Sequence, residues 1–262
     1  MAAGWQPSVV AFYRGAIGLL FVIVWLALRP GSHGLGHRRL WIWSVIAGLG
    51  IAGNFGFYFL SISEGSVAVA ATLMYCAPVF VYLISFALKL ERPRPFKWAA
   101  IIVVLTGIVL LTRVYEIGGG GLRPIGVIAG LLSGLSYALF IFGLKYAAPH
   151  GSPQAILAIA FSVLVVVLSL PAQGGEIGAV LSSASWPLFG ALGVLGAGIS
   201  FIFYVVGLRH TAPAVASILA MVEPVTASLF GVAVLDERLI GPQIIGMVLI
   251  LVTVTGLSVS SH

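Results

Sequence analysis

Nine long apolar runs constrain the fold of this chain more than any motif in it. They cover residues 9–28, 41–62, 67–88, 96–112, 125–144, 153–170, 186–208, 214–235 and 242–258. A helix of about 20 residues crosses the hydrocarbon core of a bilayer, with a range of about 17–25. Since 60% of the residues are hydrophobic and 8% are charged, the chain has too little polar surface for a soluble domain. The sequence therefore predicts an all-α polytopic membrane protein.

The chain also contains an internal repeat at a fixed offset of 146 residues, the distance from Tyr58 to Tyr204. Residues 55–92 match residues 201–238 at thirteen of 38 positions. The matches include less common residues, namely Tyr58/Tyr204, Pro78/Pro224 and Glu91-Arg92/Glu237-Arg238. Apolar bias alone would not align these residues together. The repeat predicts two domains, residues 1–117 and 122–262, joined by a flexible tether of four glycines at 118–121.

The second repeat begins with the run 125–144, whose counterpart would lie before residue 1. The complete pattern therefore has ten helices, of which nine are present and the first is missing, and we expect that the start is truncated. Five helices per repeat is an odd number, so the two repeats are expected to be inverted relative to each other. Inverted five-helix repeats favour a secondary transporter.

Lys and Arg residues predict the topology. With the C-terminus in the cytoplasm, the inside loops hold nine of them: Arg29, Arg38, Arg39, Lys89, Arg92, Arg94, Lys97, Lys145 and Arg209. The outside loops hold three, which are Arg113, Arg123 and Arg238, and acids such as Glu64 and Glu176 also fall outside. The net charge of +6 thus reflects cytoplasmic loops, and no nucleic-acid partner is expected. We predict a multi-pass protein of the cell membrane.

Glu223 is the one charged residue in the run 214–235, and it lies near the middle of that run. A carboxylate at this depth in a bilayer is costly and usually functional. We interpret it as a polar or proton-exchanging group that faces a transport cavity. The alternative is a protonated carboxyl group that is hydrogen-bonded to a neighbouring helix and serves packing alone. The equivalent residue of the first repeat is Ala77, so the two halves differ chemically here.

Arg14 lies about a turn and a half into its span. Its side chain can extend to the membrane interface, or it can face inward and bind a carboxylate substrate or pair with Glu223.

Pro78 and Pro224 are expected in the middle of continuous helices, where Pro224 would leave the carbonyl of Ala220 free. Their symmetric positions predict helix hinges for alternating access, although a single proline can also simply kink a helix.

Four further side chains, Asn54, Tyr58, Tyr75 and Tyr204, place hydrogen-bonding groups inside spans and are predicted to bind substrate. Packing between helices is an equally reasonable interpretation for the tyrosines. The spacing of Gly126, Gly130 and Gly134 predicts close helix packing. An enzyme is not expected, because all five histidines lie in or beside loops or at the terminus. No catalytic residue, metal site or cofactor is predicted.

These features resemble the drug/metabolite transporter superfamily, and within it the EamA-like transporter family. The resemblance is carried by the Ala-rich stretches 68–78 and 214–224, by Glu91 and Glu237 at the same spacing after them, by Glu223-Pro224 and by the region of Arg14. It covers nearly the whole chain. It implies ten helices in two inverted repeats and transport of small metabolites, and it does not specify a substrate.

Two hypotheses follow from the sequence. The first is a secondary transporter, expected to be an exporter of small organic metabolites, that works by alternating access. Its partners would be a small-molecule substrate and the lipid bilayer, with proton coupling through Glu223 and a homodimer left open. The alternative, suggested by the missing first helix, is a membrane helix bundle that binds a partner or has a structural role without transporting anything.

Overall fold

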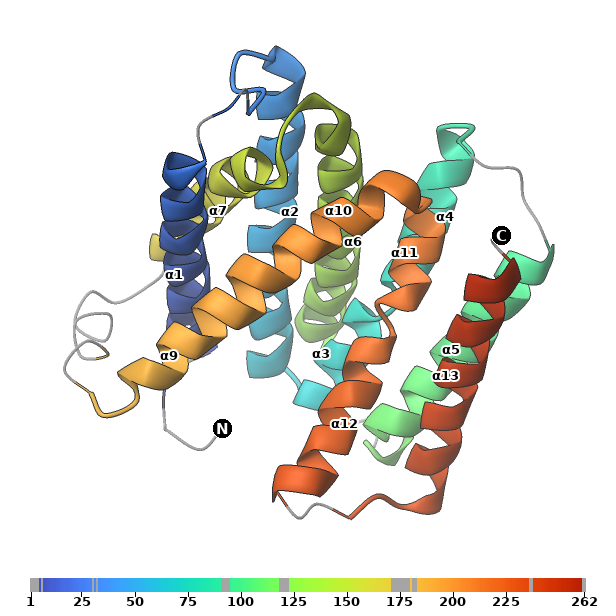
Figure 1. Ribbon diagram of the computed structural model, residues 1–262. Helices are drawn as coiled ribbons and strands as arrows, with labels where there is room; N and C mark the ends of the chain where they lie inside the picture. Colours follow the sequence, from blue (N-terminus) through green and yellow to red (C-terminus); the bar gives the residue numbers. More distant parts are fainter. Residues whose placement is uncertain are drawn as a thin grey trace. The chain divides into compact units, whose positions relative to one another are not determined.

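The computed structural model describes residues 5, 7–29, 31, 33–90, 95–117, 123–170, 180, 183–235 and 238–260. The regular elements of these residues are all helices (Figure 1). They are α1 (Pro7–Leu28), α2 (Arg38–Ser63), α3 (Val67–Met74), α4 (Ala77–Ala87), α5 (Pro95–Thr112), η1 (Val114–Glu116), α6 (Pro124–Ala147), η3 (Ala148–His150), α7 (Pro153–Ser169), α9 (Trp186–Gly193), η4 (Val194–Ile199), α10 (Ser200–His210), α11 (Pro213–Leu219), α12 (Val222–Leu235) and α13 (Gly241–Ser260).

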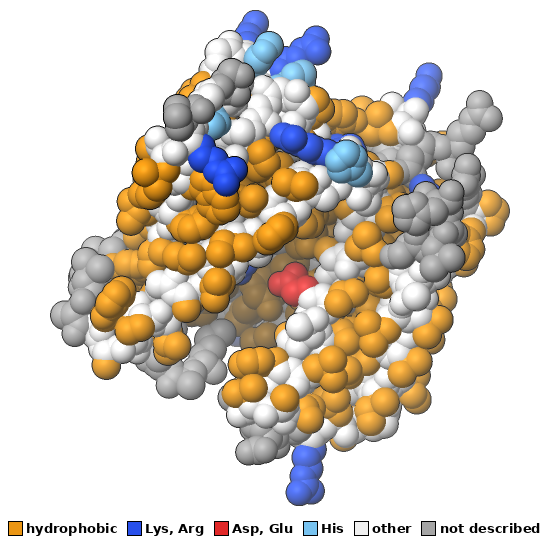
Figure 2. All heavy atoms as spheres, in the orientation of Figure 1, with side chains coloured by type: hydrophobic (Ala, Val, Ile, Leu, Met, Phe, Trp, Pro, Cys, Tyr) orange, Lys and Arg blue, Asp and Glu red, His pale blue; other side chains and the backbone are white. Residues whose placement is uncertain are grey.

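Each of the nine predicted runs coincides with helical structure in this part of the chain. Seven helical segments are long and apolar enough to cross a membrane, and two apolar helices, Pro153–Ser169 and Gly241–Gly256, are shorter. Large apolar side chains are exposed on their outer faces, with Leu28 at 75%, Leu170 at 81% and Phe203 at 71%. Figure 2 shows hydrophobic side chains covering the visible helices, with Lys, Arg and His side chains mainly at helix ends. The prediction of an all-α polytopic membrane protein is confirmed.

The internal repeat is visible in the positions at which helices begin. Adding 146 to the first residues of α1, α3 and α5 gives 153, 213 and 241, which are the first residues of α7, α11 and α13. Two of these equivalent pairs pack directly against each other, α1 on α7 and α5 on α13. The repeat is therefore a property of the structure as well as of the sequence.

The helices form two compact units that do not follow the order of the chain. Unit 1 contains residues 1–59 and 139–211, and unit 2 contains residues 60–138 and 212–262. Each unit takes helices from both sequence repeats, while α2 and α6 each contribute to both units. The domain boundaries 1–117 and 122–262 stay a prediction. The glycine run 118–121, Glu91-Arg92, Arg94, Glu176 and Glu237 lie outside the described residues.

Each unit has its own apolar core. In unit 1, α1 packs on α7 and on the α9–η4 region, and fully buried side chains include Val22, Leu40, Leu144, Ile156 and Phe161. In unit 2, α13 packs on α5, α11 and α12, and α11 packs on α4. The buried residues there include Ile101, Ile108, Ile218, Met221 and Ile250.

The glycine spacing in α6 serves close packing within unit 2, as predicted. A Cβ atom at Gly130 would lie 2.7 Å from the Cβ of Leu73, and one at Gly134 would lie 2.9 Å from the carbonyl oxygen of Leu73. Ser61 also donates a hydrogen bond of 2.7 Å to the carbonyl of Gly126. The three glycines at 126, 130 and 134 therefore let α6 pack closely against the end of α3.

The expectation of continuous helices around Pro78 and Pro224 is wrong. The span 67–88 is interrupted at Tyr75-Cys76 and the span 214–235 at Ala220-Met221, which is nearly the same place in the two repeats. Pro78 is the second residue of α4 and Pro224 the third of α12. Proline is favoured in the first turn of a helix, where its missing N–H has no helical partner to lose. The carbonyl of Ala220 is not free, because it accepts a hydrogen bond of 3.0 Å from the N–H of Glu223.

Candidate functional site

The residues predicted to bind substrate divide between the two units. Arg14, Asn54, Tyr58 and Tyr204 belong to unit 1, whereas Tyr75 and Glu223 belong to unit 2, as do the two predicted hinge prolines. Each group has a defined environment within its own unit.

Arg14 faces the interior of unit 1. Its Nη2 donates a hydrogen bond of 2.7 Å to the carbonyl of Gly196, 182 residues further along the chain. Its guanidinium carbon also lies 5.8 Å from the centre of the Phe55 ring on α2, within the range of a cation–π interaction. Arg14 thus connects α1 to η4 and to α2.

The acceptor of this hydrogen bond lies in a π-helical turn, η4, between α9 and α10. Such turns are rare and are often found at functional sites. Here the helices approach closely, since a Cβ atom at Gly18 would lie 2.7 Å from the Cβ of Ala197. The glycines at 193, 196 and 198 are the sequence signal for this contact, which was not among the predictions.

Beside Arg14 lies an apolar pocket of about 410 Å³. Its lining comes from α1, α2 and α9 with the segments before α1 and α9: Trp5, Pro7, Val10, Ala11, Arg14, Phe55, Phe59, Ser185, Leu188, Phe189 and Leu192. Among the described residues of this lining, Arg14 is the only charged one. Phe55 and Phe59 are stacked with ring centres 6.1 Å apart, and Trp5 meets Phe189 edge to face at 6.0 Å. The pocket can therefore hold a small apolar or aromatic body and place a negative group beside one cation.

Three further residues were predicted to bind substrate, namely Asn54 and Tyr58 on α2 and Tyr204 on α10. Asn54 is 7% exposed, and its neighbours Phe55 and Phe59 line the pocket. The Tyr58 ring lies 6.0 Å from that of Phe59. The Tyr204 ring lies 6.0 Å from Phe140 and 6.3 Å from Phe201, so it is part of an aromatic cluster. The aromatic side chains that form the pocket wall carry no polar group and are ordinary for a membrane helix, so the sequence does not mark them.

In unit 2, Glu223 lies in the first turn of α12, directly after the interruption of its span. Its side chain is exposed. The first turn of a helix carries unpaired N–H groups and the positive end of the helix dipole, which favour a negative charge there. The local backbone therefore gives a carboxylate electrostatic support that the middle of a continuous helix would not give.

The equivalent interruption in the first repeat has a different character. Tyr75 is 8% exposed, and its N–H donates to the carbonyl of Ala71 at 2.9 Å. Ala77, the counterpart of Glu223, is fully buried at the start of α4. Among the described residues, no group of His, Cys, Asp and Glu side chains could hold a metal ion.

The long apolar helices and the repeat together define a multi-pass membrane protein. The chain belongs to the EamA-like transporter family, which matches residues 1–113 and 124–259. It is therefore a transporter with a small-molecule substrate, embedded in a lipid bilayer.

Similar proteins agree with this assignment. An uncharacterized transporter of Archaeoglobus fulgidus is 31% identical over 195 residues, which cover 74% of this chain and 68% of the relative. The uncharacterized inner membrane transporter YedA of Escherichia coli K12 is 26% identical over 90% of this chain and 76% of its own length. A solved crystal structure shares the fold with a TM-score of 0.78 at 20% identity, covering 98% of this chain and 89% of the other.

Proposed function

We propose that this transporter exports small organic metabolites by alternating access, and that its substrates combine an apolar or aromatic body with a negatively charged group. The observation that carries the proposal is the pair of interrupted spans at equivalent positions of the two repeats. Interrupted helices near the membrane midplane form the substrate and ion sites of many transporters with repeats. The inverted relation of the two repeats is part of the proposal.

The substrate class is suggested by the Arg14 pocket. Its volume of about 410 Å³ lies within the usual range for small-ligand sites, about 300–1,000 Å³. The aromatic lining would contact a planar or branched body, while the guanidinium, which already contacts Phe55, would bind a carboxylate. We therefore propose that Arg14 binds a carboxylate substrate and does not pair with Glu223.

The experiment is uptake into proteoliposomes that contain the purified full-length chain. We would compare aromatic and branched carboxylates with their neutral amides. Carboxylates should be transported at least 10-fold faster, and Arg14→Gln should remove this preference. Arg113→Gln, a change of an exposed arginine outside the spans, is the control. Equal rates for acids and amides would contradict the proposed substrate class without affecting the assignment to a transporter family.

Glu223 is proposed to couple export to protons. It is an exposed carboxylate at an interruption of a span, so a proton could reach it from a water-filled cavity. The hinge role of Pro78 and Pro224 belongs to the same proposal, because helix interruptions absorb backbone rotation more easily than continuous helices do.

The direction of transport and the orientation of the chain in the membrane can be tested together. We propose a cell-membrane location with a cytoplasmic C-terminus, so that Arg38 and Lys97 face the cytoplasm. In a Cys76→Ser background, cysteine at position 97 should react with an impermeant maleimide in inside-out vesicles and not in intact cells. Export predicts substrate accumulation in energised inside-out vesicles. Labelling of position 97 in intact cells would reverse the topology.

A further inference from the structure

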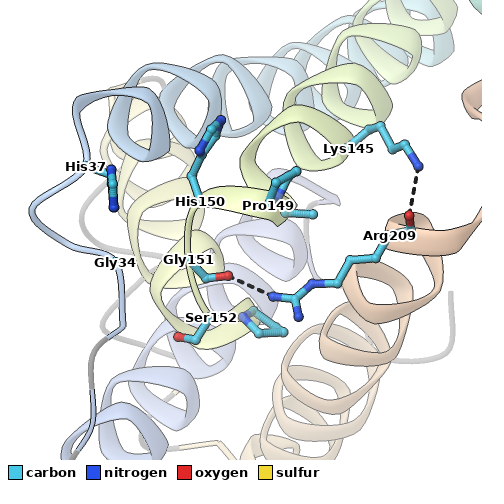
Figure 3. Close-up of a pocket in the computed structure, with 10 residues that line it drawn as sticks. Gly34, His37, Lys145, Pro149, His150, Gly151, Ser152 and Arg209 are labelled. Carbon is cyan, nitrogen blue, oxygen red and sulfur yellow. Dashed lines mark hydrogen bonds between the residues drawn. The ribbon is translucent and has the colours of Figure 1, made fainter.

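A second cavity of about 680 Å³ lies at one end of unit 1, away from the Arg14 pocket. The loop before α2, the connection from α6 through η3 to α7, and the end of α10 form it. Its lining residues are Gly34, His37, Lys145, Ala148, Pro149, His150, Gly151, Ser152, Pro153 and Arg209 (Figure 3). Two of these residues are basic and two are histidines, and none is acidic. A cavity with this charge is suited to an anion.

Hydrogen bonds hold these segments together. The N–H of Ser152 donates to the carbonyl of His33 at 3.2 Å, and the His33 ring contacts the hydroxyl of Ser152 at 3.1 Å. Arg209 donates to the carbonyl of Gly151 at 2.8 Å (Figure 3). Gly34 has a φ of +77°, and a Cβ atom there would lie 2.1 Å from the carbonyl oxygen of His150. The walls of the cavity are therefore built by specific contacts between distant parts of the sequence.

The basic side chains have different roles. The Lys145 ammonium donates to the carbonyls of Leu208, Arg209 and Thr211 at 2.6, 3.2 and 2.9 Å, which occupies its three N–H groups at the end of α10. Arg209 has five N–H donors, and its hydrogen bond to Gly151 leaves others for a ligand. The rings of His37 and His150 lie 6.3 Å apart at the same cavity. Arg209 and the two imidazoles are thus the groups that can bind an anion.

The surroundings place this cavity at the level of lipid headgroups. It lies where α2 and α7 begin and where α6 and α10 end. Aromatic residues typical of a membrane interface are found at these helix ends: the Trp41 indole donates to the carbonyl of Leu35, and the Trp43 and Tyr146 rings lie 4.8 Å apart. The beginnings of α2 and α7 bring the positive ends of two helix dipoles to the cavity, and the ends of α6 and α10 bring negative ends, of which that of α10 is offset by the Lys145 ammonium.

We propose that this cavity binds the phosphate of an anionic phospholipid headgroup, with Arg209, His37 and His150 as its ligands. Basic pockets between membrane helices are known to bind acidic headgroups in this way. A free phosphate would offer the same chemistry, but the position beside interfacial Trp and Tyr residues favours a lipid whose chains lie along the outer faces of the helices. The site is separate from the Arg14 pocket and does not depend on the proposed substrate.

The test is native mass spectrometry of the full-length chain in detergent with added phosphatidylglycerol or phosphatidylcholine. One phosphatidylglycerol should be retained per chain, and Arg209→Gln should weaken its retention about five-fold. Since Arg209 also supports the loops, Pro149→Glu provides a second variant that keeps every hydrogen bond described above and adds a negative charge at the exposed cavity wall. It should weaken retention in the same way, whereas Pro149→Gln should not.

Arg39→Gln is the matched control, because Arg39 is exposed at the start of α2 and does not line the cavity. It should leave retention unchanged. Equal retention of the two lipids, or equal loss in the Arg39 and Arg209 variants, would overturn a specific site in favour of general surface charge. If inorganic phosphate stabilised the chain against heat as well as phosphatidylglycerol does, the lipid assignment would be wrong.

Discussion

In the first interrupted span, α3 ends at Met74 and α4 begins at Ala77; in the second, α11 ends at Leu219 and α12 begins at Val222. Both second helices carry a proline in the first turn. The first interruption is packed: Ala77 is fully buried, and Gly134 of α6 lies against the carbonyl of Leu73. The second places an exposed carboxylate, Glu223, at the equivalent position. The same kind of helix interruption thus carries a buried alanine in one repeat and an exposed carboxylate in the other.

The largest expected effect is on transport. Glu223→Gln keeps the shape of the side chain and removes its charge. If Glu223 carries the coupling proton, gradient-driven accumulation in proteoliposomes should disappear, while exchange between two substrate pools persists. Glu116→Gln, which changes an exposed carboxylate outside the spans, should behave like the parent. Full accumulation by the Gln variant would end the coupling proposal and leave both interruptions with packing roles.

The reciprocal change tests whether the first interruption can hold a carboxylate. Ala77→Glu would place a charge at a fully buried position, and we expect a loss of stability of about 3 kcal/mol. Ala77→Met adds similar length without charge and should cost less, and Glu223→Ala should cost less than either. Thermal unfolding in detergent would measure all three. A stable Ala77→Glu protein would show that the two sites are interchangeable.

The packing difference can be tested at Gly134. Gly134→Ala puts a methyl group 2.9 Å from the carbonyl oxygen of Leu73, so we expect a loss of about 1–3 kcal/mol. Gly256→Ala is the control in the same unit, since a Cβ atom there meets nothing within 4 Å. It should be neutral or slightly stabilising. If both variants unfolded at the same temperature, close packing of α6 against the first interruption would not contribute to stability.

The smallest expected effect is a change in stability from substitutions at the starts of the two interrupted spans. Ser66 caps α3 by accepting a hydrogen bond from the N–H of Val69, whereas its counterpart Ala212 cannot cap α11. Ser66→Ala should cost about 1 kcal/mol. Ala212 has φ −66° and ψ 144°, close to the −70° and 151° of Ser152, which does cap its helix. Ala212→Ser should therefore stabilise the protein, and a fall in its unfolding temperature would contradict this.

The sequence predicted the helices well because long apolar runs and Lys/Arg-bearing loops mark the spans directly. It did not predict the interruptions at Tyr75-Cys76 and Ala220-Met221, because these residues are as apolar as their neighbours. Pro78 and Pro224 marked the right places, although a proline in the first turn of a helix and one in its middle look the same in sequence. Glu223 was identified for its charge, but its exposure depends on the tertiary structure.

The pockets were harder to predict. Arg14 was found because a charge within an apolar run is unusual. Phe55 and Phe59, which line its pocket, are ordinary residues for a membrane helix and gave no signal. The basic cavity joins His37 from the loop before α2, His150 from η3 and Arg209 from the end of α10, and no local pattern in the sequence relates them. The distribution of Lys and Arg residues indicated only that these loops share one side of the membrane.

The interleaving of the two units has a consequence for biosynthesis. The equivalent helices α1 and α7, like α5 and α13, pack together although their starts are separated by 146 residues. At a synthesis rate of about 5–20 residues per second, α7 leaves the ribosome roughly 7–30 s after α1. During that interval, lipid chains can cover the waiting helix faces, because they are as apolar as the side chains that later replace them. The bilayer would then act as a temporary partner for each early helix, and neither sequence repeat would complete its packing until the other had been made.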